Sequence, residues 1–498
     1  MDKPNIVFIT VDQMRDDFMG CADNEIVQTI AMDHLAKRGI RFERAFSPLP
    51  VCIPARASIM TGLEGNSLGI TEYIEGFELP TDQTLPQLLS DDGYQTKVIG
   101  KMHTYPERCH YGFDSMLLCE EGRKFGQANN EFRGYDDYEM WLAEEGYAGQ
   151  AFSHGMANNA HSVTTWPLPD YLHPTEWIGT ESCKAIANRD WTRPLFLWTS
   201  FTAPHPPLTP LYKDFILYDE DEMREPVLGD WLDKHPYLHE LNIGQSHGGK
   251  KTKKEIALAY RAYCALITQV DRQINRIIGT LREQGMLENT WFIFTSDHGD
   301  NMGDHQLWGK KNFLRGSCQI PFIITPPTKG DLDKILGSEW APGRVSTSTI
   351  GLQDILPTCL DIANVDIPKD IDGKSLLPVV EQPEIGVRET LLGEIGLPGD
   401  RSLMITDGTW KYIWYERDGA ELLFNIDDDP YEINDLSETS QKELHKRRSC
   451  LINKLEQRDA DRAVKNGQLN PTEPGVKLSS VEKARLATDH NVRGIHTL

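Results

Sequence analysis

Four short apolar runs, each followed at once by polar or charged residues, constrain the fold of this chain most. The runs cover residues 5–11, 97–99, 195–201 and 291–295, and helical patterns lie between them, the longest over about 254–284. Short apolar runs rich in β-branched and aromatic residues are typical of strands buried on both faces of a sheet. Strands that alternate with helices predict an α/β fold with a large, mostly parallel sheet flanked by helices.

Polar side chains stand directly after these runs. The first run ends at Asp12 and Gln13, and the fourth ends at Asp297 and His298. Because ligands bind outside the carboxyl ends of parallel strands, we expect these side chains to converge on one site. Carboxylate and amide oxygens suit calcium or magnesium, and an imidazole widens the choice to manganese. Taken singly, each residue is equally an ordinary turn residue, so the prediction depends on their convergence.

A second set of side chains could bind a tetrahedral oxyanion. Its members are basic and stand close to the same strand ends or to a helix start, where charged donors can surround an anion. Each lysine considered alone is as readily a solvated surface charge. The candidates are Arg56, Lys101, His103, His205 and Lys310.

The pentapeptide Cys52-Ile-Pro-Ala-Arg56 adds a candidate nucleophile. Pro54 is expected at the first position of a helix, where a missing N–H costs nothing. Cys52 then lies just before a helix N-terminus, where partial positive charge favours anions and activated nucleophiles. The alternative interpretation of the pentapeptide is a buried thiol before a helix that begins with proline.

Two long polar segments, residues 120–181 and 212–252, are only weakly periodic. They are predicted to be excursions from the core, and such loops commonly determine substrate selectivity. Three aromatic side chains in the first excursion could stack on a substrate or pack within their own loop: Trp166, Tyr171 and Trp177.

The pattern changes near residue 380, where short apolar runs separated by Asp-Gly turns replace the strand and helix alternation. We therefore predict two domains, a catalytic domain over residues 1–380 and a small α+β subdomain with an antiparallel sheet, plus a tail, over 381–498. The elements predicted in the subdomain are strands over 403–406, 409–416 and 420–426 and a helix over 440–457.

The charge and cysteine content exclude several classes of function. The net charge of −24, from 51 basic and 75 acidic residues, argues against a nucleic-acid partner, and it confines any anion site to a local basic pocket. Nine cysteines without a Cys-X-X-Cys pair predict mostly reduced thiols. No apolar run reaches 18 residues, so no membrane partner is expected. Without a signal-peptide pattern, the chain as it stands is expected in the cytoplasm, or in the periplasm or secreted if a signal was removed. The oligomeric state is left open.

These motifs, taken in order over about residues 4–440, resemble those of the type I sulfatases, the formylglycine-dependent family of the alkaline phosphatase-like superfamily. Three places depart from the common pattern: Met102 replaces a tryptophan, Leu314-Arg315 replaces Tyr-Glu, and the residues after Thr61-Gly62 diverge from the common Arg/Pro/His-rich form. The segments that carry the resemblance are Asp12-Gln13, Cys52 to Gly62, Gly93 to His103, Ala203 to Pro207, Thr295 to His305, Leu307 to Lys310, Trp410 to Ile413 and Asp427 to Glu432.

The resemblance implies hydrolysis of a sulfate monoester by a hydrated formylglycine, which a maturation enzyme makes from Cys52. His205 or Lys310 would protonate the leaving oxygen, and His103 would take a proton from the second hydroxyl of the hydrate. One divalent cation is implied, calcium first, with magnesium or manganese as alternatives. The implied metal ligands are Asp12, Gln13, Cys52, Asp297 and His298, and the implied catalytic residues are Cys52, Arg56, Lys101, His103, His205 and Lys310.

Two other functions remain open from the sequence. A phosphonate monoester or phosphodiester hydrolase could use the same scaffold with a similar metal site, and a non-catalytic binding protein could retain the fold. For a sulfatase, the sequence does not distinguish an aryl or steroid sulfate from a sulfated carbohydrate.

Overall fold

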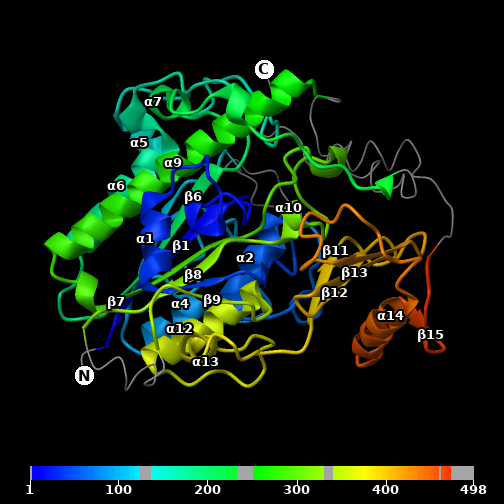
Figure 1. Cartoon of the computed structure of the whole chain (residues 1–498). Coiled ribbons are helices and arrows are strands. Elements are labelled where there is room, and N and C mark those ends of the chain that lie inside the picture. The colour runs from blue at the N-terminus through cyan, green and yellow to red at the C-terminus, as the bar shows by residue number, and fades with distance from the viewer. Residues whose placement is uncertain (1–2, 123–135, 233–250, 330–339, 459–460, 473–498) are drawn as a thin grey trace.

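A mixed, mostly parallel sheet forms the centre of the large domain (Figure 1). The computed structural model describes residues 3–122, 136–232, 251–329, 340–458 and 461–472. The sheet has eight strands in the order β5-β4-β6-β1-β7-β8-β2-β9. Their bounds are β1 Asn5–Asp12, β2 Ile40–Phe42, β4 Gln95–Gly100, β5 Ser115–Leu118, β6 Leu195–Pro204, β7 Thr290–Ser296, β8 Phe322–Thr325 and β9 Arg344–Ser346.

The predicted mostly parallel sheet is confirmed. The four apolar runs of the sequence form β1, β4, β6 and β7, and each pairs in parallel with its neighbours among them. Antiparallel pairing occurs where β8 meets β7 and β2. The sequence analysis missed β2, β5, β8 and β9, since strands of three or four residues carry too few side chains to show a period.

Both faces of this sheet are covered by helices, which explains the continuous apolar runs (Figure 1). Along β1, Val7 and Ile9 point into one core and Ile6 and Phe8 into the other. Burying each such side chain contributes about 1.5–3 kcal/mol. The first core is closed by α1 Ile30–Arg38, α6 Pro174–Ala187 and α9 Lys253–Glu283, and the second by α2 Cys52–Thr61, α4 Leu85–Asp91, α12 Ile355–Ala363 and α13 Leu377–Glu381.

The first predicted excursion is only partly a loop, because it contains α5 Asp137–Glu144 and most of α6. Trp177 is buried on α6, where its ring packs against those of Tyr138 and Trp141. Trp166 is buried as well, whereas Tyr171 is 53% exposed. The second excursion contains α7 Tyr212–Phe215, and its residues 233–250 lie outside the described part of the chain.

A four-stranded antiparallel sheet follows the large domain. An antiparallel sheet was predicted there, but its first strand, β11, was not. One of its faces is covered by α14 Gln441–Glu456, with Leu451 and Leu455 in the shared core. Its other face packs against Val51, Phe313 and Leu314 of the large domain. The strands, in the order in which they pair, are β11 Leu391–Ile395, β12 Ser402–Thr406, β13 Trp410–Tyr415 and β14 Glu421–Asn425.

A buried ion pair of the C-terminal region is hydrogen-bonded to helix α10 Arg315–Cys318 of the large domain. Lys411 of β13 is fully buried and pairs with Glu432, whose second carboxylate oxygen accepts a hydrogen bond from the Arg315 backbone N–H at 2.7 Å. The C-terminal sheet therefore packs against segments on both sides of the candidate site, just before Cys52 and just after Lys310. Within the described residues, no helix has the length and apolarity needed to cross a membrane.

The remaining elements are short. They are η1 Gly20–Ala22, β3 Ala45–Phe46, α3 Gly65–Leu68, η2 Asp170–Leu172, η3 Glu220–Glu222, η5 Leu287–Asn289, η6 Asp304–Gln306, α10 Arg315–Cys318, β10 Ile350–Gly351, η7 Leu352–Asp354, β15 Val464–Lys465 and β16 Gln468–Leu469.

Candidate active site

Cys52 opens helix α2 at the carboxyl edge of the large sheet. The helix begins at Cys52 itself, with Val51 as its extended N-cap, so Pro54 is the third helical residue and not the first, as the sequence analysis expected. Proline is tolerated there because the first four N–H groups of a helix have no intrahelical acceptor. Cys52 is buried, with 2% of its surface exposed.

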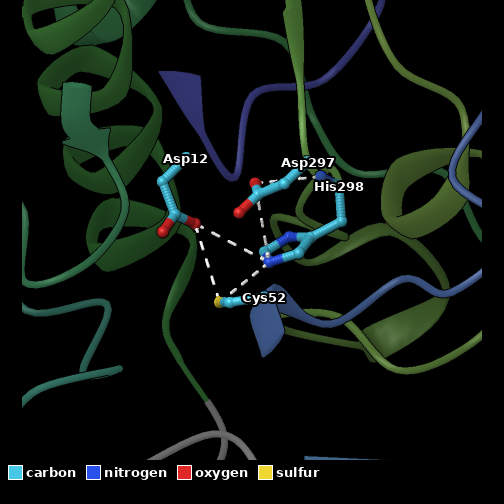
Figure 2. A group of neighbouring side chains, drawn as sticks. All are labelled: Asp12, Cys52, Asp297 and His298. Atoms are coloured by element: carbon cyan, nitrogen blue, oxygen red, sulfur yellow. Dashed lines mark hydrogen bonds and ion pairs between the residues drawn. The ribbon is translucent and has the colours of Figure 1, made fainter. Parts of the chain in front are cut away.

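Side chains from β1 and from the end of β7 surround the thiol (Figure 2). The Cys52 Sγ atom lies 3.2 Å from Nε2 of His298 and 3.9 Å from Oδ1 of Asp12. Ligand atoms of Asp12, Cys52, Asp297 and His298 all lie within 4.8 Å of one another, and all four residues are buried. The convergence expected from the strand ends is therefore present in the structure.

Gln13 adds an amide oxygen to this cluster. It adopts a left-handed backbone conformation, with φ of 69°, and its Oε1 accepts a hydrogen bond of 2.7 Å from Lys310. Its Nε2 donates to Asp300, which also bonds to Nε2 of His161 at 2.6 Å. Asp300 thus fixes the amide with its oxygen toward the cluster. His161 was not predicted, because it lies in an excursion without a recognisable pattern.

The donor set fits a divalent cation. Two buried carboxylates, an amide oxygen and an imidazole are ligands that calcium, magnesium or manganese accept. Burying two carboxylates is costly unless positive charge lies beside them. Here Lys101 pairs with Oδ2 of Asp12, and Nε of Arg56 lies 2.9 Å from Oδ2 of Asp297. The identity of the cation stays a prediction.

Arg56 connects the nucleophile helix to two strand ends. Besides Asp297, its guanidinium donates to the Lys101 carbonyl at 2.7 Å and to the Ser200 hydroxyl at 2.9 Å. Its side chain is completely buried. In this structure Arg56 contacts the Asp297 carboxylate and the Lys101 carbonyl, and its role in orienting the nucleophile stays a prediction.

Two glutamates that follow β5 also belong to the site, and the sequence analysis missed both. Glu121 lies 2.7 Å from the Lys101 ammonium and 3.7 Å from Nδ1 of His205. Glu120 accepts hydrogen bonds from the backbone N–H groups of Met102 and His103, at 2.7 and 3.0 Å. The signal was present, since the two acids stand just beyond a strand and are separated from it by Cys119 alone, but β5 is too short to recognise.

The two predicted histidines occupy different positions. His205 is buried, and its Nδ1 donates to the Pro206 carbonyl at 2.5 Å, which leaves Nε2 as the nitrogen that can exchange a proton. His103 has a left-handed backbone, with φ of 56°, and its Nε2 bonds to the Tyr73 hydroxyl at 3.2 Å. The structure therefore places His205 beside the cluster and His103 at its border.

Lys310 completes the cluster. Its ammonium lies 3.2 Å from the Cys52 sulfur, in addition to its contact with Gln13. Burial and the Asp12 carboxylate oppose ionisation of the Cys52 thiol, but Lys310 and Lys101 outweigh them and lower the pKa of the thiol to about 7. The site thus favours an anionic group at position 52.

The same charges shift the pKa of neighbouring groups. Burial raises the pKa of Asp12, but Lys101 and His205 outweigh it and hold the pKa well below its usual range. Burial and Lys310 lower the pKa of His205 well below its usual range. For His298, burial also acts against protonation, but Asp297 contributes to a net rise in its pKa. Excess positive charge on the Lys310 side is what an anionic substrate requires.

Known protein families and individual proteins match this chain over most of its length. A model of the sulfatase family matches residues 4–365, and a model described as N-sulphoglucosamine sulphohydrolase, C-terminal, matches residues 303–461. The chain is 37% identical to an arylsulfatase of Clostridium perfringens (strain 13 / Type A), with 92% of this chain and 95% of that one covered. It is 29% identical to a choline-sulfatase of Rhizobium meliloti (strain 1021), with 88% and 83% covered.

A solved structure shares the fold. The phosphonate monoester hydrolase of Agrobacterium radiobacter superposes with a TM-score of 0.76 at 23% identity, covering 93% of this chain and 97% of that one. At this identity the likeness concerns the fold alone. From the family model, the arylsulfatase relative and the common fold, the chain belongs to the sulfatase family within the alkaline-phosphatase-like fold and is a sulfuric ester hydrolase.

Proposed function

We propose that this enzyme hydrolyses aryl sulfate monoesters to an alcohol and inorganic sulfate, using a formylglycine made from Cys52 by a maturation enzyme and one divalent cation, calcium. The observation that carries the proposal is the position of the Cys52 Sγ atom, 3.2 Å from both His298 Nε2 and Lys310 Nζ at the start of α2. A nucleophile at that point lies between the Lys310 ammonium and the proposed metal ligands, of which His298 is the nearest.

When present, the hydrated aldehyde supplies the nucleophilic oxygen, and the cation promotes loss of its proton and balances negative charge. The chain's own residues do the rest. Arg56 holds Asp297 through its Nε–H. Lys101 and Lys310 bind the sulfate oxygens that gain charge in the transition state. His205 gives a proton from Nε2 to the leaving oxygen, while its Nδ1–H stays on the Pro206 carbonyl.

His205 must be protonated for this step. Burial and Lys310 hold its pKa low, so it is neutral near pH 7 without substrate. The negative charge of a bound sulfate acts in the opposite direction and favours the imidazolium. Proton uptake at Nε2 would therefore accompany substrate binding.

The aryl leaving group is supported by the relative from Clostridium perfringens, which is an arylsulfatase at 37% identity over most of both chains. A sulfated carbohydrate and a phosphonate monoester are the alternatives. The phosphonate alternative draws on the Agrobacterium radiobacter enzyme, whose fold this chain shares. Substrate preference separates the three.

The test uses full-length protein produced with a maturation enzyme and supplied with calcium. We expect kcat/KM for 4-nitrophenyl sulfate to exceed that for 4-nitrophenyl phenylphosphonate and for glucosamine 6-sulfate by roughly 10²-fold or more, since differences of a few kcal/mol in transition-state binding separate substrates on this scale. Cys52→Ala, which keeps a small apolar side chain, serves as the inactive control. A preference for the phosphonate or for the sugar sulfate would overturn the proposal.

Calcium is tested with the same protein. After chelation, calcium should restore more activity than magnesium or manganese, because a buried set of mainly oxygen donors matches its preferences. Restoration by manganese alone would contradict the choice of calcium and leave the ester specificity intact.

A further inference from the structure

Two cavities flank the cation-lined centre, and they differ in their relation to the nucleophile. One, of about 40 Å³, is bordered by His103, Tyr73 and Ile53, the residue that follows Cys52. The other, of about 80 Å³, is bordered by His205 and Glu121 and by the N-termini of α5 and α6. An in-line displacement expels the leaving group on the side opposite the attacking atom. The smaller cavity borders Ile53, next to the nucleophile, whereas the larger one borders His205, the proposed proton donor to the leaving oxygen, so the larger cavity is the one in position for the leaving group.

The wall of the larger cavity is aromatic. Phe152, Tyr138 and Trp166 border it. Helix α5 lies beside α6 (Figure 1), where the ring of Tyr138 contacts that of Trp177. Gly122 lies under the Phe152 ring, since a Cβ there would come within 2.6 Å of Phe152 Cζ. The Phe152 ring therefore packs directly on the Gly122 backbone. Flat apolar walls of this kind bind a ring-shaped or compact apolar group.

Two polar atoms in this wall have no hydrogen-bond partner among the described residues. They are Nε1 of Trp166 and Nε2 of His205, and both are buried. Buried indole N–H and imidazole nitrogen atoms normally have a partner, because leaving one unsatisfied costs about 1–3 kcal/mol. A bound alcohol can satisfy both, with its reacting oxygen at His205 and an acceptor group at Trp166.

The wall of the larger cavity disfavours a bound anion. The part of its wall within the described residues includes the carboxyl groups of Glu121, Asp136 and Glu139 and neither lysine nor arginine. The helix N-termini that could attract an anion already have caps, since Asp136 accepts from the Glu139 N–H at 2.8 Å and His173 from the Thr175 N–H at 3.1 Å. Burial and the neighbouring Glu139 carboxylate raise the pKa of Asp136 to about 7.

We propose that this cavity is the leaving-group site and that it selects compact, ring-containing alcohols without negative charge, with Glu121 as the residue that excludes anionic ones. Glu121 suits this role because its carboxylate contacts Lys101 on the sulfate side and borders the cavity on the other. Glu121 thereby balances the charge of Lys101 on the side of the cavity. A substrate whose alcohol carries a second anionic group would bring that group next to the Glu121 carboxylate. This inference rests on the proposed function.

The test compares methyl 4-(sulfooxy)benzoate with 4-(sulfooxy)benzoate, in which a carboxylate replaces the neutral methyl ester opposite the sulfate. We expect kcat/KM to be on the order of 10- to 100-fold higher for the neutral methyl ester, the size of effect that a like charge several ångströms away produces near a protein surface. Glu121→Gln should reduce this ratio by about 10-fold. Glu107→Gln, which removes an acid beside the smaller cavity, is the matched control and should leave the ratio unchanged.

A second readout does not depend on turnover. Binding of the two product phenols, measured by calorimetry on wild type and Glu121→Gln, should show the same preference for methyl 4-hydroxybenzoate over 4-hydroxybenzoate and the same loss of it. Trp166→Phe should raise KM for 4-nitrophenyl sulfate and leave that for phenyl sulfate, which lacks an acceptor in the ring, unchanged.

The outcomes separate the two proposals. Equal kcat/KM values for both benzoates, unaffected by Glu121→Gln, would overturn the leaving-group inference and leave the sulfatase proposal standing. Failure to hydrolyse any sulfate ester with converted Cys52 would overturn both.

Discussion

The proposed sulfate-binding centre and the proposed leaving-group cavity are built in opposite ways. The centre gathers Lys101, Lys310 and Arg56 around buried carboxylates at the ends of sheet strands and the start of one helix. The cavity gathers aromatic rings and acids from loops and short helices. Lys101 follows a strand, Arg56 lies on helix α2 and Lys310 lies between η6 and α10, and together they hold the charges that we propose bind the sulfate, whereas loops and short helices form the wall beside the alcohol. Changes in the centre should therefore alter the hydrolysis rate of all sulfate esters, and changes in the cavity should alter the preference among their alcohols.

The largest effect should follow from loss of a metal ligand. Asp297→Asn removes one of the two buried carboxylates and the partner of Arg56, so we expect activity to be abolished on all substrates and the bound metal to fall well below one ion per chain. Elemental analysis and circular dichroism on the same sample check this. Asp370→Asn, an exposed matched change, should keep both metal and activity. Full metal content in Asp297→Asn would show that the ligand set is wrong.

The next prediction tests whether the lysines of the centre affect all substrates equally. Lys101→Ala and Lys310→Ala should each lower kcat/KM by about 10²–10³-fold, the loss that follows removal of one transition-state donor. Because the sulfate is common to all substrates, the factor should be the same across a panel of aryl sulfates. A lysine variant that spared some leaving groups would break the division between centre and cavity.

A smaller effect is expected from Glu120. Its carboxylate holds the backbone of Met102 and His103, so Glu120→Ala should lower kcat by about 10-fold on all substrates, with KM little changed, through loss of His103 positioning. Glu120→Gln keeps an acceptor and should recover most of the rate. If the alanine and glutamine variants behaved alike, hydrogen bonding to the backbone would not be the cause.

The smallest effect on activity at neutral pH is expected from the buried Arg15–Asp17 ion pair, which lies next to the segment that follows β7. Arg15 pairs with Asp17 at 2.7 Å and donates to the carbonyls of Asp300 and Asn301. Burial opposes ionisation of Asp17, but Arg15 outweighs it and lowers the pKa of that carboxyl. A lowered carboxyl pKa contributes stability above the unfolded-state value near 4, and this is lost as the pH falls toward the folded-state value.

Asp17→Asn should therefore lower the free energy of unfolding by about 3 kcal/mol at pH 7, as for one broken buried pair, and the gap to wild type should shrink as the pH falls below 4. Urea unfolding between pH 7 and pH 3 measures both. Parallel stability curves would mean that the pair contributes nothing specific. Activity per folded molecule should stay close to wild type at pH 7.

The same contrast explains how much could be predicted from the sequence. The sheet and the convergence of polar side chains were predictable because each strand is a continuous apolar run with a polar residue at or just after its end, as at Asp12 and Asp297. Helix α5 and most of α6 were taken for loop, since aromatic and polar residues obscure their period. Glu121 was missed because β5 has only four residues. The cavity was unpredictable in principle, because its wall joins segments whose contacts only the tertiary fold creates.

The role of position 52 is tested most directly by measuring activity against the fraction of chains that carry an aldehyde there. Preparations made with increasing amounts of maturation enzyme would be assayed for kcat on 4-nitrophenyl sulfate, and the peptide containing Cys52 would be quantified by mass spectrometry. The account predicts a straight line through the origin, because only the modified residue supplies the nucleophile. Appreciable activity extrapolated to zero aldehyde would contradict it.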